Sequence, residues 1–218
     1  MGRLRRRRLI PEILPQTRGR QLWPLIAKPS REDASLGISS DAVCHDLAGL
    51  QATVERLHGK YRQPILIERF LDGREFNAAI LEVRGRPEVL PISEILFTEA
   101  ATGGPRLTSY EAKWIEDSAA YRATPPVCPA DLDDETRLAI GQTALRVFRL
   151  LGGRDYGRVD LRLDGEGRPR VLEYNPNPDI SPDAGYCRSL TAAGWSYSRF
   201  VEQLLENGRV REDRDGKS

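Results

Sequence analysis

Histidine, methionine and cysteine are scarce in this chain, which has 2 His, 1 Met and 3 Cys among 218 residues. His45 and His58 fall in one expected helix, so a histidine-based catalytic or metal site has little to draw on. Cys44, Cys128 and Cys187 are odd in number, widely spaced and in no CxxC pattern, which indicates neither a disulfide framework nor a zinc site. Chemistry must therefore come from carboxylates, lysines and arginines.

The sequence also lacks long apolar runs and an excess of one charge. No run approaches the roughly 18 to 20 apolar residues that a membrane span needs, and no apolar signal region follows the first arginines. We therefore expect a cytoplasmic protein without a membrane partner. The 33 basic and 32 acidic residues leave a net charge of +1, which gives no reason to expect nucleic acid. Five arginines within Met1–Arg8 could form a nucleic-acid arm, but we favour a solvated tail.

The most informative segment spans residues 157–178. Apolar and polar residues alternate from Arg158 onward, as expected of a strand with one buried face, and a return strand ends near Asn175. If Glu166-Gly167 forms a two-residue turn, the numbers of facing residues sum to 333. Asp160 then lies opposite Glu173 and Arg158 opposite Asn175, with all four side chains on one face.

Two facing carboxylates predict a metal site on this hairpin. Their Cβ atoms would lie roughly 4.5 to 5.5 Å apart, so Asp160 and Glu173 would repel unless they were solvated, protonated or bridged by a cation. Mg²⁺ prefers such oxygen ligands together with substrate phosphates, and the Asn175 carboxamide adds a neutral one. The alternative is a solvated face whose charges pair with one another. The rigid Asn-Pro-Asn-Pro run that ends at Pro178 favours the ligand site, because it fixes the last side chains of the strand.

The chain is long enough for one domain or two small lobes. We expect an irregular Arg-rich leader over 1–21, a small lobe over 22–72, a large lobe with the metal-binding hairpin over 73–206, and a charged, frayed tail over 207–218.

Periodicity predicts the elements within these lobes. An amphipathic helix carries an apolar stripe from Val43 to Leu57, with Ser40 or Asp41 as its cap, and a second helix over 132–151 has Leu138, Leu145 and Phe148 on its stripe. Strands are expected over 22–28, 65–70, 75–83 and 88–96, and helices over 183–193 and 197–205. The stretch 97–128 has no strong periodicity and is expected to be a long functional excursion.

Five motifs in order extend this pattern. They are KPSREDASLGIS at 28–39, ILIERFLDGREF at 65–76, SYEAKW at 109–114, GRVDLRLD at 157–164 and LEYNPNP at 172–178. Across roughly three quarters of the chain they resemble the ATP-grasp enzymes, and within them D-alanine-D-alanine ligase. The resemblance implies an α+β fold, in which two lobes of antiparallel sheet with helices grip a nucleotide between them.

The resemblance also implies roles for individual residues. Lys28 and the Ser30–Gly37 loop, including Ser35, would contact the nucleotide phosphates, and Glu75 would accept a ribose hydroxyl. The hinge that touches adenine would consist of Glu68, Arg69, Phe70 and Leu71. Lys113 would approach the terminal phosphate from a mobile loop.

The reaction that the resemblance implies is carboxylate activation by ATP. A substrate carboxylate attacks the γ-phosphate to form an acyl phosphate, and an amine then displaces phosphate. Asp160, Glu173 and Asn175 would hold two Mg²⁺ ions, or Mn²⁺ in their place, and Arg158 would stabilise the transferring phosphoryl group. A non-catalytic ATP-binding module remains the alternative.

The chain departs from the family pattern at three places. Only 27 residues precede Lys28, where the family has an amino-terminal lobe, so the chain is expected to be a fragment, or a partner or homodimer supplies that surface. Asp33 and Ala34 replace a Gly and a Ser in the phosphate-covering loop. Ala184 and Gly185 replace the Ser-Leu pair that binds the substrate carboxylate. The missing hydroxyl predicts a substrate other than D-alanine.

Overall fold

The computed structural model describes residues 23–32, 34–98 and 104–215. They form two compact units: residues up to Phe70 with 104–122, and residues from Leu71 to 98 with 123–215. We expected 104–122 within the larger lobe, but these residues pack with the first unit. The leader over 1–21 and Asp33 lie outside the described residues.

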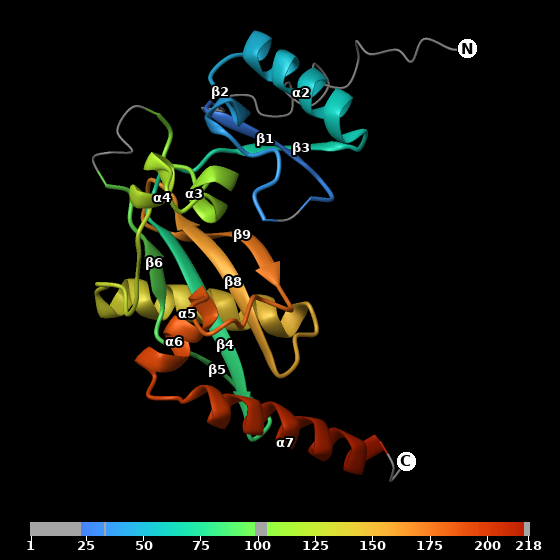
Figure 1. The fold of residues 1–218 in the computed structure, drawn as a ribbon, viewed down its shortest axis with the longest axis vertical. Helices are drawn as coiled ribbons and strands as arrows, with labels where there is room; N and C mark the ends of the chain where they lie inside the picture. The colour runs from blue at the N-terminus through green and yellow to red at the C-terminus, as the bar shows by residue number, and fades with distance from the viewer. Residues whose placement is uncertain (1–22, 33, 99–103, 216–218) are drawn as a thin grey trace. The chain divides into compact units, whose positions relative to one another are not determined.

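The first unit is a small antiparallel sheet covered by a helix (Figure 1). Its strands, in the order β2-β1-β3, are β1 (Leu25–Pro29), β2 (Val43–Cys44) and β3 (Ile65–Arg69). Leu50 and Leu57 of α2 (Leu47–Tyr61) pack on Leu25 and Ala27 of β1. A short 3-10 turn η2 (Ser40–Ala42) and the small helices α3 (Tyr110–Trp114) and α4 (Ala119–Arg122) complete the unit.

The start of α2 differs from the expectation. The expected caps, Ser40 and Asp41, lie in η2 instead, and Val43 pairs with β1. The helix is capped by Asp46, whose Oδ1 accepts a hydrogen bond from the Gly49 amide at 2.8 Å. Val43 fits the helical periodicity, but its pairing with β1 places it in a strand instead.

The second unit is built on a six-stranded antiparallel sheet. Its strands are β4 (Glu75–Val83), β5 (Arg86–Val89), β6 (Ser93–Ile95), β7 (Pro126–Val127), β8 (Tyr156–Leu163) and β9 (Pro169–Asn175). The order is β7-β6-β4-β8-β9, and β5 pairs with β4. We expected one strand over 88–96, but it is divided into β5 and β6. Pro91 lies in the break, where it has no N–H to donate to a sheet ladder.

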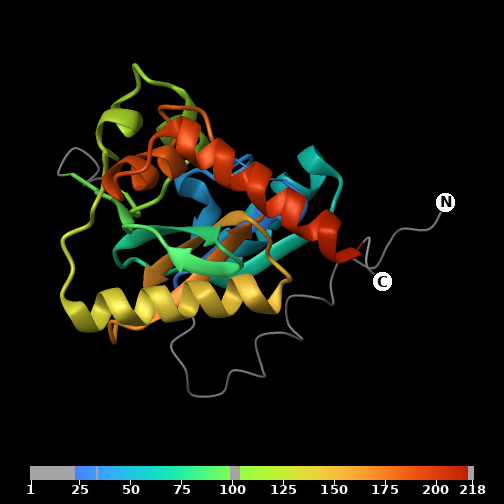
Figure 2. The same ribbon diagram turned by 90° about the horizontal axis from the view of Figure 1, so that it is seen from below.

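Helices cover both faces of this sheet (Figure 2). Helix α5 (Asp134–Leu150) packs on Phe76 and Ile80, whereas α6 (Gly185–Ala192) and α7 (Tyr197–Asp215) pack on Ala79 and Leu81. Successive side chains of β4 point to opposite faces of the sheet, so the strand contributes residues to both hydrophobic cores. Both faces of the strand are apolar in its middle.

The apolar stripe of α5 is rotated from its expected position. Ile140, Ala144 and Phe148 are buried against the sheet, with Leu145 beside them, whereas Leu138 is 60% exposed. Leu138 was therefore wrongly assigned to the core. The polar Asp134 and Glu135 precede it, and Asp133 caps the helix.

The segment expected to be a frayed tail continues α7 as far as Asp215. Asn207 donates a hydrogen bond through Nδ2 to the Glu82 carbonyl at 2.9 Å, and Arg211 forms an ion pair with Asp155. These contacts tie the polar end of the helix to the sheet. In the parts of the chain that the structure describes, neither α7 nor any other helix is long and apolar enough to cross a membrane.

Candidate functional site

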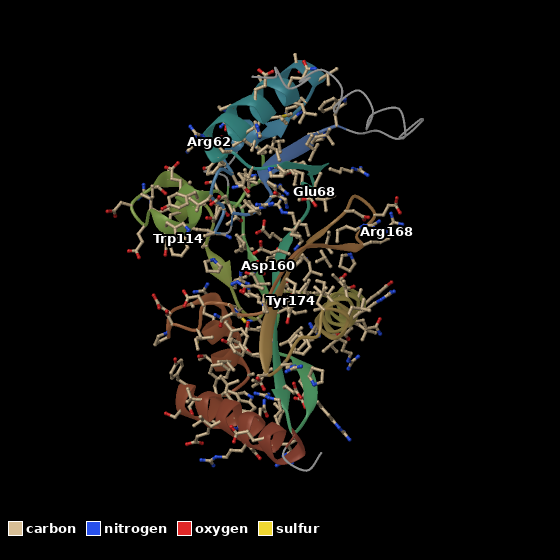
Figure 3. All side chains as sticks on the ribbon, turned by 90° about the vertical axis from the view of Figure 1, so that its right-hand side faces the viewer. Arg62, Glu68, Trp114, Asp160, Arg168 and Tyr174 are labelled. Atoms are coloured by element: carbon tan, nitrogen blue, oxygen red, sulfur yellow. The ribbon has the colours of Figure 1, made fainter. Side chains whose placement is uncertain are left out.

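The register predicted for the β8–β9 hairpin is confirmed at its polar end. Asp160 is the Cα partner of Glu173, and Arg158 is the partner of Asn175. Val159 and Leu161 face α5 in the core, so Arg158 and Asp160 lie on the opposite face of the strand. Figure 3 labels Asp160 in this unit.

The turn that produces this register is not the expected one. Asp164 and Arg168 close a three-residue loop, in which Gly167 has a φ of 76°. The pairs near the loop, such as Arg162 with Arg170, are therefore one residue out of the expected register. A bulge between Asp160 and Leu161, which leaves Leu172 as the extra residue of β9, restores it. Two deviations compensate, so Asp160 and Glu173 face each other.

A cation does lie between the two carboxylates, and it is the Arg158 guanidinium. Its Nε donates to Asp160 Oδ1 at 2.7 Å and its Nη2 to Asp160 Oδ2 at 2.9 Å. Nη2 also lies 3.9 Å from Glu173 Oε1. Burial opposes the charge, but the charge and hydrogen bonds of Asp160 outweigh it and raise the pKa of Arg158. The alternative in which the charges pair with one another therefore describes this structure.

Asn77 is a site residue that the sequence reading missed. It is the Cα partner of Asp160 across β4 and β8, and its Nδ2 donates to Asp160 Oδ1 at 2.8 Å. Asp160 is thus held from two sides and is only 6% exposed. The available signal was a lone amide in the otherwise apolar run Phe76–Leu81, on the face where the polar residues of β8 lie.

The donor set fits a hard cation. Two carboxylates and one carboxamide lie on one face of the hairpin, and Glu173 remains 55% exposed. Asn175 Oδ1 accepts from the Asn177 amide at 3.0 Å, which orients its carboxamide. No group of three or more His, Cys, Asp or Glu side chains suited to a metal occurs among the described residues, so an ion here would complete its shell with the Asn175 oxygen, water or a substrate.

Glu75 and Leu71, predicted to contact the nucleotide, both meet Arg162 in the second unit. Arg162 donates to Glu75 Oε2 through Nε at 2.9 Å and through Nη2 at 2.6 Å, and its Nη1 binds the Leu71 carbonyl. Its guanidinium also lies over the Phe97 ring. The Glu75 carboxylate is therefore part of a buried ion pair.

In the first unit, the structure brings Lys28 together with one hinge residue. Lys28 Nζ forms an ion pair with Glu68, since the two side chains project from neighbouring strands β1 and β3. Arg69 is exposed at the end of β3, and Phe70 is buried with its amide bound to the Pro24 carbonyl at 2.9 Å. The lysine thus has a carboxylate partner that the sequence reading did not anticipate.

The phosphate-covering loop and the Lys113 segment form one structure in the first unit. Ser35 Oγ donates to the Thr108 carbonyl at 2.9 Å, and Trp114 Nε1 donates to the Ala34 carbonyl at 3.2 Å. Ala34 and Ser35 have positive φ values of 51° and 62°, a conformation that side chains rarely adopt. Helix α3 is capped by Ser109 and carries Lys113. The next residue, Trp114, is labelled in Figure 3. Two loops remote in sequence are thereby held together.

The substituted Ala184 lies at the start of α6 as its cap and makes no side-chain capping hydrogen bond. The nearby Asp179 accepts hydrogen bonds from the Ser181 hydroxyl at 2.7 Å and amide at 2.8 Å. These bonds, helped by the charge of Arg158, lower the pKa of Asp179. The loop after β9 therefore carries an ionised carboxylate, and its Ala184 has no hydroxyl.

Solved structures identify the fold class. A crystal structure of D-alanine–D-alanine ligase from Bacillus anthracis matches with a TM-score of 0.71 and 24% identity, over 94% of this chain and 60% of that chain. VanG D-Ala:D-Ser ligase from Enterococcus faecalis matches with a TM-score of 0.68 and 21% identity, over 90% and 53%. The architecture is the α+β ATP-grasp fold, as predicted.

Residues 4–206 match the family model described as D-ala D-ala ligase C-terminus, and the chain belongs to that family. The uncharacterized protein y4sG of Sinorhizobium fredii is 35% identical over 184 residues, covering 84% of this chain and 52% of that protein. D-alanine–D-alanine ligase of Bordetella petrii is 33% identical over 188 residues, covering 86% and 53%. The chain therefore spans about half the length of the curated relatives it matches.

Proposed function

We propose that this chain is the ATP-binding part of an ATP- and Mg²⁺-dependent carboxylate–amine ligase that works through an acyl phosphate. The observation that carries the proposal is the convergence of Asp160, Glu173 and Asn175 on one face of the hairpin, beside Arg158. Family membership supports it, because the relatives with assigned names are D-alanine–D-alanine ligases.

The metal ligands would be Asp160, Glu173 and Asn175, with Glu173 shared between two Mg²⁺ ions or Mn²⁺ in their place. Such ions neutralise charge on the phosphates and orient them for in-line transfer. Because Arg158 now holds both Asp160 oxygens, metal loading requires the guanidinium to leave that carboxylate. The released side chain would then stabilise the transferring phosphoryl group and the oxyanion of the substrate.

The remaining predicted residues would bind the nucleotide. Lys28, Ser35 and Lys113 would meet phosphate oxygens, since an ammonium or hydroxyl donor gains most against an ionised acceptor. Lys113 would also act in catalysis by approaching the terminal phosphate. The adenine hinge would be Glu68–Leu71, largely through its backbone, and Glu75, held by Arg162, would accept a ribose hydroxyl bond.

The substrates would be a small carboxylate and an amine, with a carboxylate substrate other than D-alanine. Ala184 and Gly185 offer no side-chain hydroxyl, and Asp179 adds negative charge to the same loop. We place the protein in the cytoplasm without a membrane partner.

Glu173→Gln tests the binding half of this proposal. The Glu173 side chain is 55% exposed and its ion pair with Arg158 is long, at 3.9 Å, so its loss should change the unfolding midpoint little. We expect the Kd for Mg-ATP, measured by calorimetry, to rise at least about tenfold because a metal ligand is lost. Glu166→Gln, in the loop of the same hairpin, is the matched control and should bind normally. Unchanged nucleotide binding in Glu173→Gln, or an equal loss of stability, would reject the metal assignment.

Phosphate release separates the ligase from the alternative, a non-catalytic ATP-binding module. The pairing of Arg158 with Asp160 favours the module, because the arginine is engaged before any nucleotide arrives. The ligase releases phosphate from ATP when supplied with a pool of amino acids or short peptides. Persistent Mg-ATP binding without release by the full-length chain would select the module.

A further inference from the structure

A charged hollow of about 830 Å³ lies in the second unit between the β4–β5 hairpin and α7. Its charged lining residues are Arg84, Arg86, Glu88, Arg199, Glu202 and Glu206. The hollow lies at the Val83 end of β4, six residues beyond Asn77. At ~3.3 Å per residue the two places are about 20 Å apart along the strand. The hollow is therefore separate from the candidate metal site of the hairpin.

Three of the six charged side chains in the hollow are positive and three are negative. None of them takes part in an ion pair with another described residue. Elsewhere in the same unit Arg74, Arg158 and Arg162 each hold a carboxylate at 2.6 to 2.9 Å. Because these opposite charges share a hollow without forming ion pairs, a ligand that carries both a positive and a negative group can bind to both sets of side chains.

The walls of the hollow are fixed at this spacing. Arg84 and Gly85 have φ values of 52° and 76°, as in the tight hairpin turns that match strand twist. Asn207, adjacent to Glu206, donates to the Glu82 carbonyl at 2.9 Å, which ties α7 to the hairpin. That contact sets the separation of the two backbones at this end of the hollow, which favours a preformed site.

One of the three arginines is also held in place by an aromatic ring. The Arg199 guanidinium lies 3.9 Å from the centre of the Trp195 ring, within the range of a cation–π contact. Trp195 itself lines the hollow and packs against the core formed with α6. The indole therefore gives the site a rigid apolar wall between charged groups.

We propose that this hollow binds a short zwitterionic peptide with free termini. Its carboxylate would lie against Arg84 and Arg86, which can bind it through two parallel N–H donors, and its ammonium against Glu202 and Glu206. The volume falls in the range of about 300 to 1,000 Å³ that is usual for small-ligand sites. A ligand of one charge sign would gain from three of the side chains and be repelled by the other three.

Titration calorimetry with tetra-alanine tests the proposal on the full chain, in the absence of nucleotide. We expect saturable binding of the free peptide and at least about tenfold weaker binding of the acetylated, amidated peptide, because both terminal charges are lost. Equal binding of the two peptides, or no binding of the free one up to millimolar concentrations, overturns the proposal. So does tighter binding of pyrophosphate, which would indicate an anion site.

Two double variants test the two walls independently. Arg84→Gln with Arg86→Gln, and Glu202→Gln with Glu206→Gln, should each weaken tetra-alanine binding at least tenfold with an unchanged unfolding midpoint, since none of the four side chains forms an ion pair with a described residue. Arg146→Gln with Arg149→Gln on α5 is the control and should bind normally. If either double variant unfolds, the other still decides, and peptide binding that survives in a folded variant refutes the site. Mg-ATP binding should be unaffected in all three, which separates this proposal from the ligase assignment.

Discussion

Arg158 and Arg162 lie two positions on either side of Asp160, on the same face of β8, yet their surroundings differ. Arg162 is 3% exposed and its donors are divided between Glu75 and the Leu71 carbonyl. Arg158 is 18% exposed and faces Asp160, the exposed Glu173 and, at longer range, Asp179. A buried arginine with every direction occupied is typical of a structural role, whereas one among several carboxylates, some of them open to solvent, can exchange with a ligand.

The comparison is tested most strongly at Arg162. Arg162→Gln leaves the Glu75 carboxylate buried without its countercharge, so we expect the free energy of unfolding to fall by about 3 to 5 kcal/mol. Urea unfolding followed by circular dichroism measures it. Arg146→Gln, an exposed arginine on α5, should change nothing. A loss below about 1 kcal/mol would mean that the pair is no more important than a surface ion pair.

The difference between the two arginines was only partly predictable from the sequence. Alternation correctly placed Arg158, Asp160 and Arg162 on one face of a strand. The facing pairs Asp160–Glu173 and Arg158–Asn175 were also correct, although they were derived from a two-residue turn that the structure does not contain. Burial did not follow, because it depends on Glu75 of β4, which is remote in sequence and joins Arg162 only through sheet pairing.

The misassigned elements have the same kind of cause. The predicted turn was wrong because the sequence alone specifies neither the three-residue loop nor the bulge at Leu172. The predicted register near Asp160 was still right, because the loop and the bulge shift it in opposite directions. Val43 lies in a strand rather than in the predicted helix because it pairs with β1. The segment 104–122 could not be assigned to the first unit, since contacts such as Ser35 with Thr108 span long separations. Local patterns predicted the elements, and long-range pairing decided their edges.

Arg158→Gln sharpens the comparison from the other side. Without the guanidinium, a divalent ion no longer competes with a bound cation for the Asp160 and Glu173 carboxylates. Mn²⁺ alone should therefore bind about tenfold more tightly, which is a gain of about 1.4 kcal/mol in binding free energy. Electron paramagnetic resonance of Mn²⁺ measures this without nucleotide. Arg170→Gln, near the hairpin loop, should leave Mn²⁺ binding unchanged. Weaker Mn²⁺ binding in Arg158→Gln would show that the arginine assists the ion rather than occupying its place.

Asn77→Ala should have a smaller effect, because Asp160 keeps Arg158. The loss of one hydrogen bond predicts about 1 kcal/mol less stability and, if Asn77 positions the carboxylate, about fivefold weaker Mg-ATP binding. Asn77→Thr replaces the amide donor with a hydroxyl donor and should recover part of the binding. Stability and nucleotide affinity together distinguish the roles, since a purely structural residue would change unfolding and leave the Kd for Mg-ATP unaltered.

The smallest expected effect concerns Asp179, the outermost carboxylate around Arg158. Hydrogen bonds from Ser181, more than the charge of Arg158, hold its pKa below the usual value of about 3.9. A lowered pKa in the folded protein means that the ionised group contributes stability above the unfolded value, and that this contribution disappears as pH falls through the folded pKa. Carbon-13 NMR of the carboxyl group should therefore show a larger rise of the Asp179 pKa in Ser181→Ala than in Arg158→Gln.

Ser198→Ala, on the exposed part of α7, is the control for this titration and should not move the Asp179 pKa. A larger shift in Arg158→Gln than in Ser181→Ala would place Asp179 among the direct partners of the arginine. The Arg158 guanidinium would then have acceptors on every side, as the Arg162 guanidinium has in Glu75 and the Leu71 carbonyl. The ease of exchange that distinguishes the two arginines would be lost, because three carboxylates would have to release the guanidinium before a metal ion could bind.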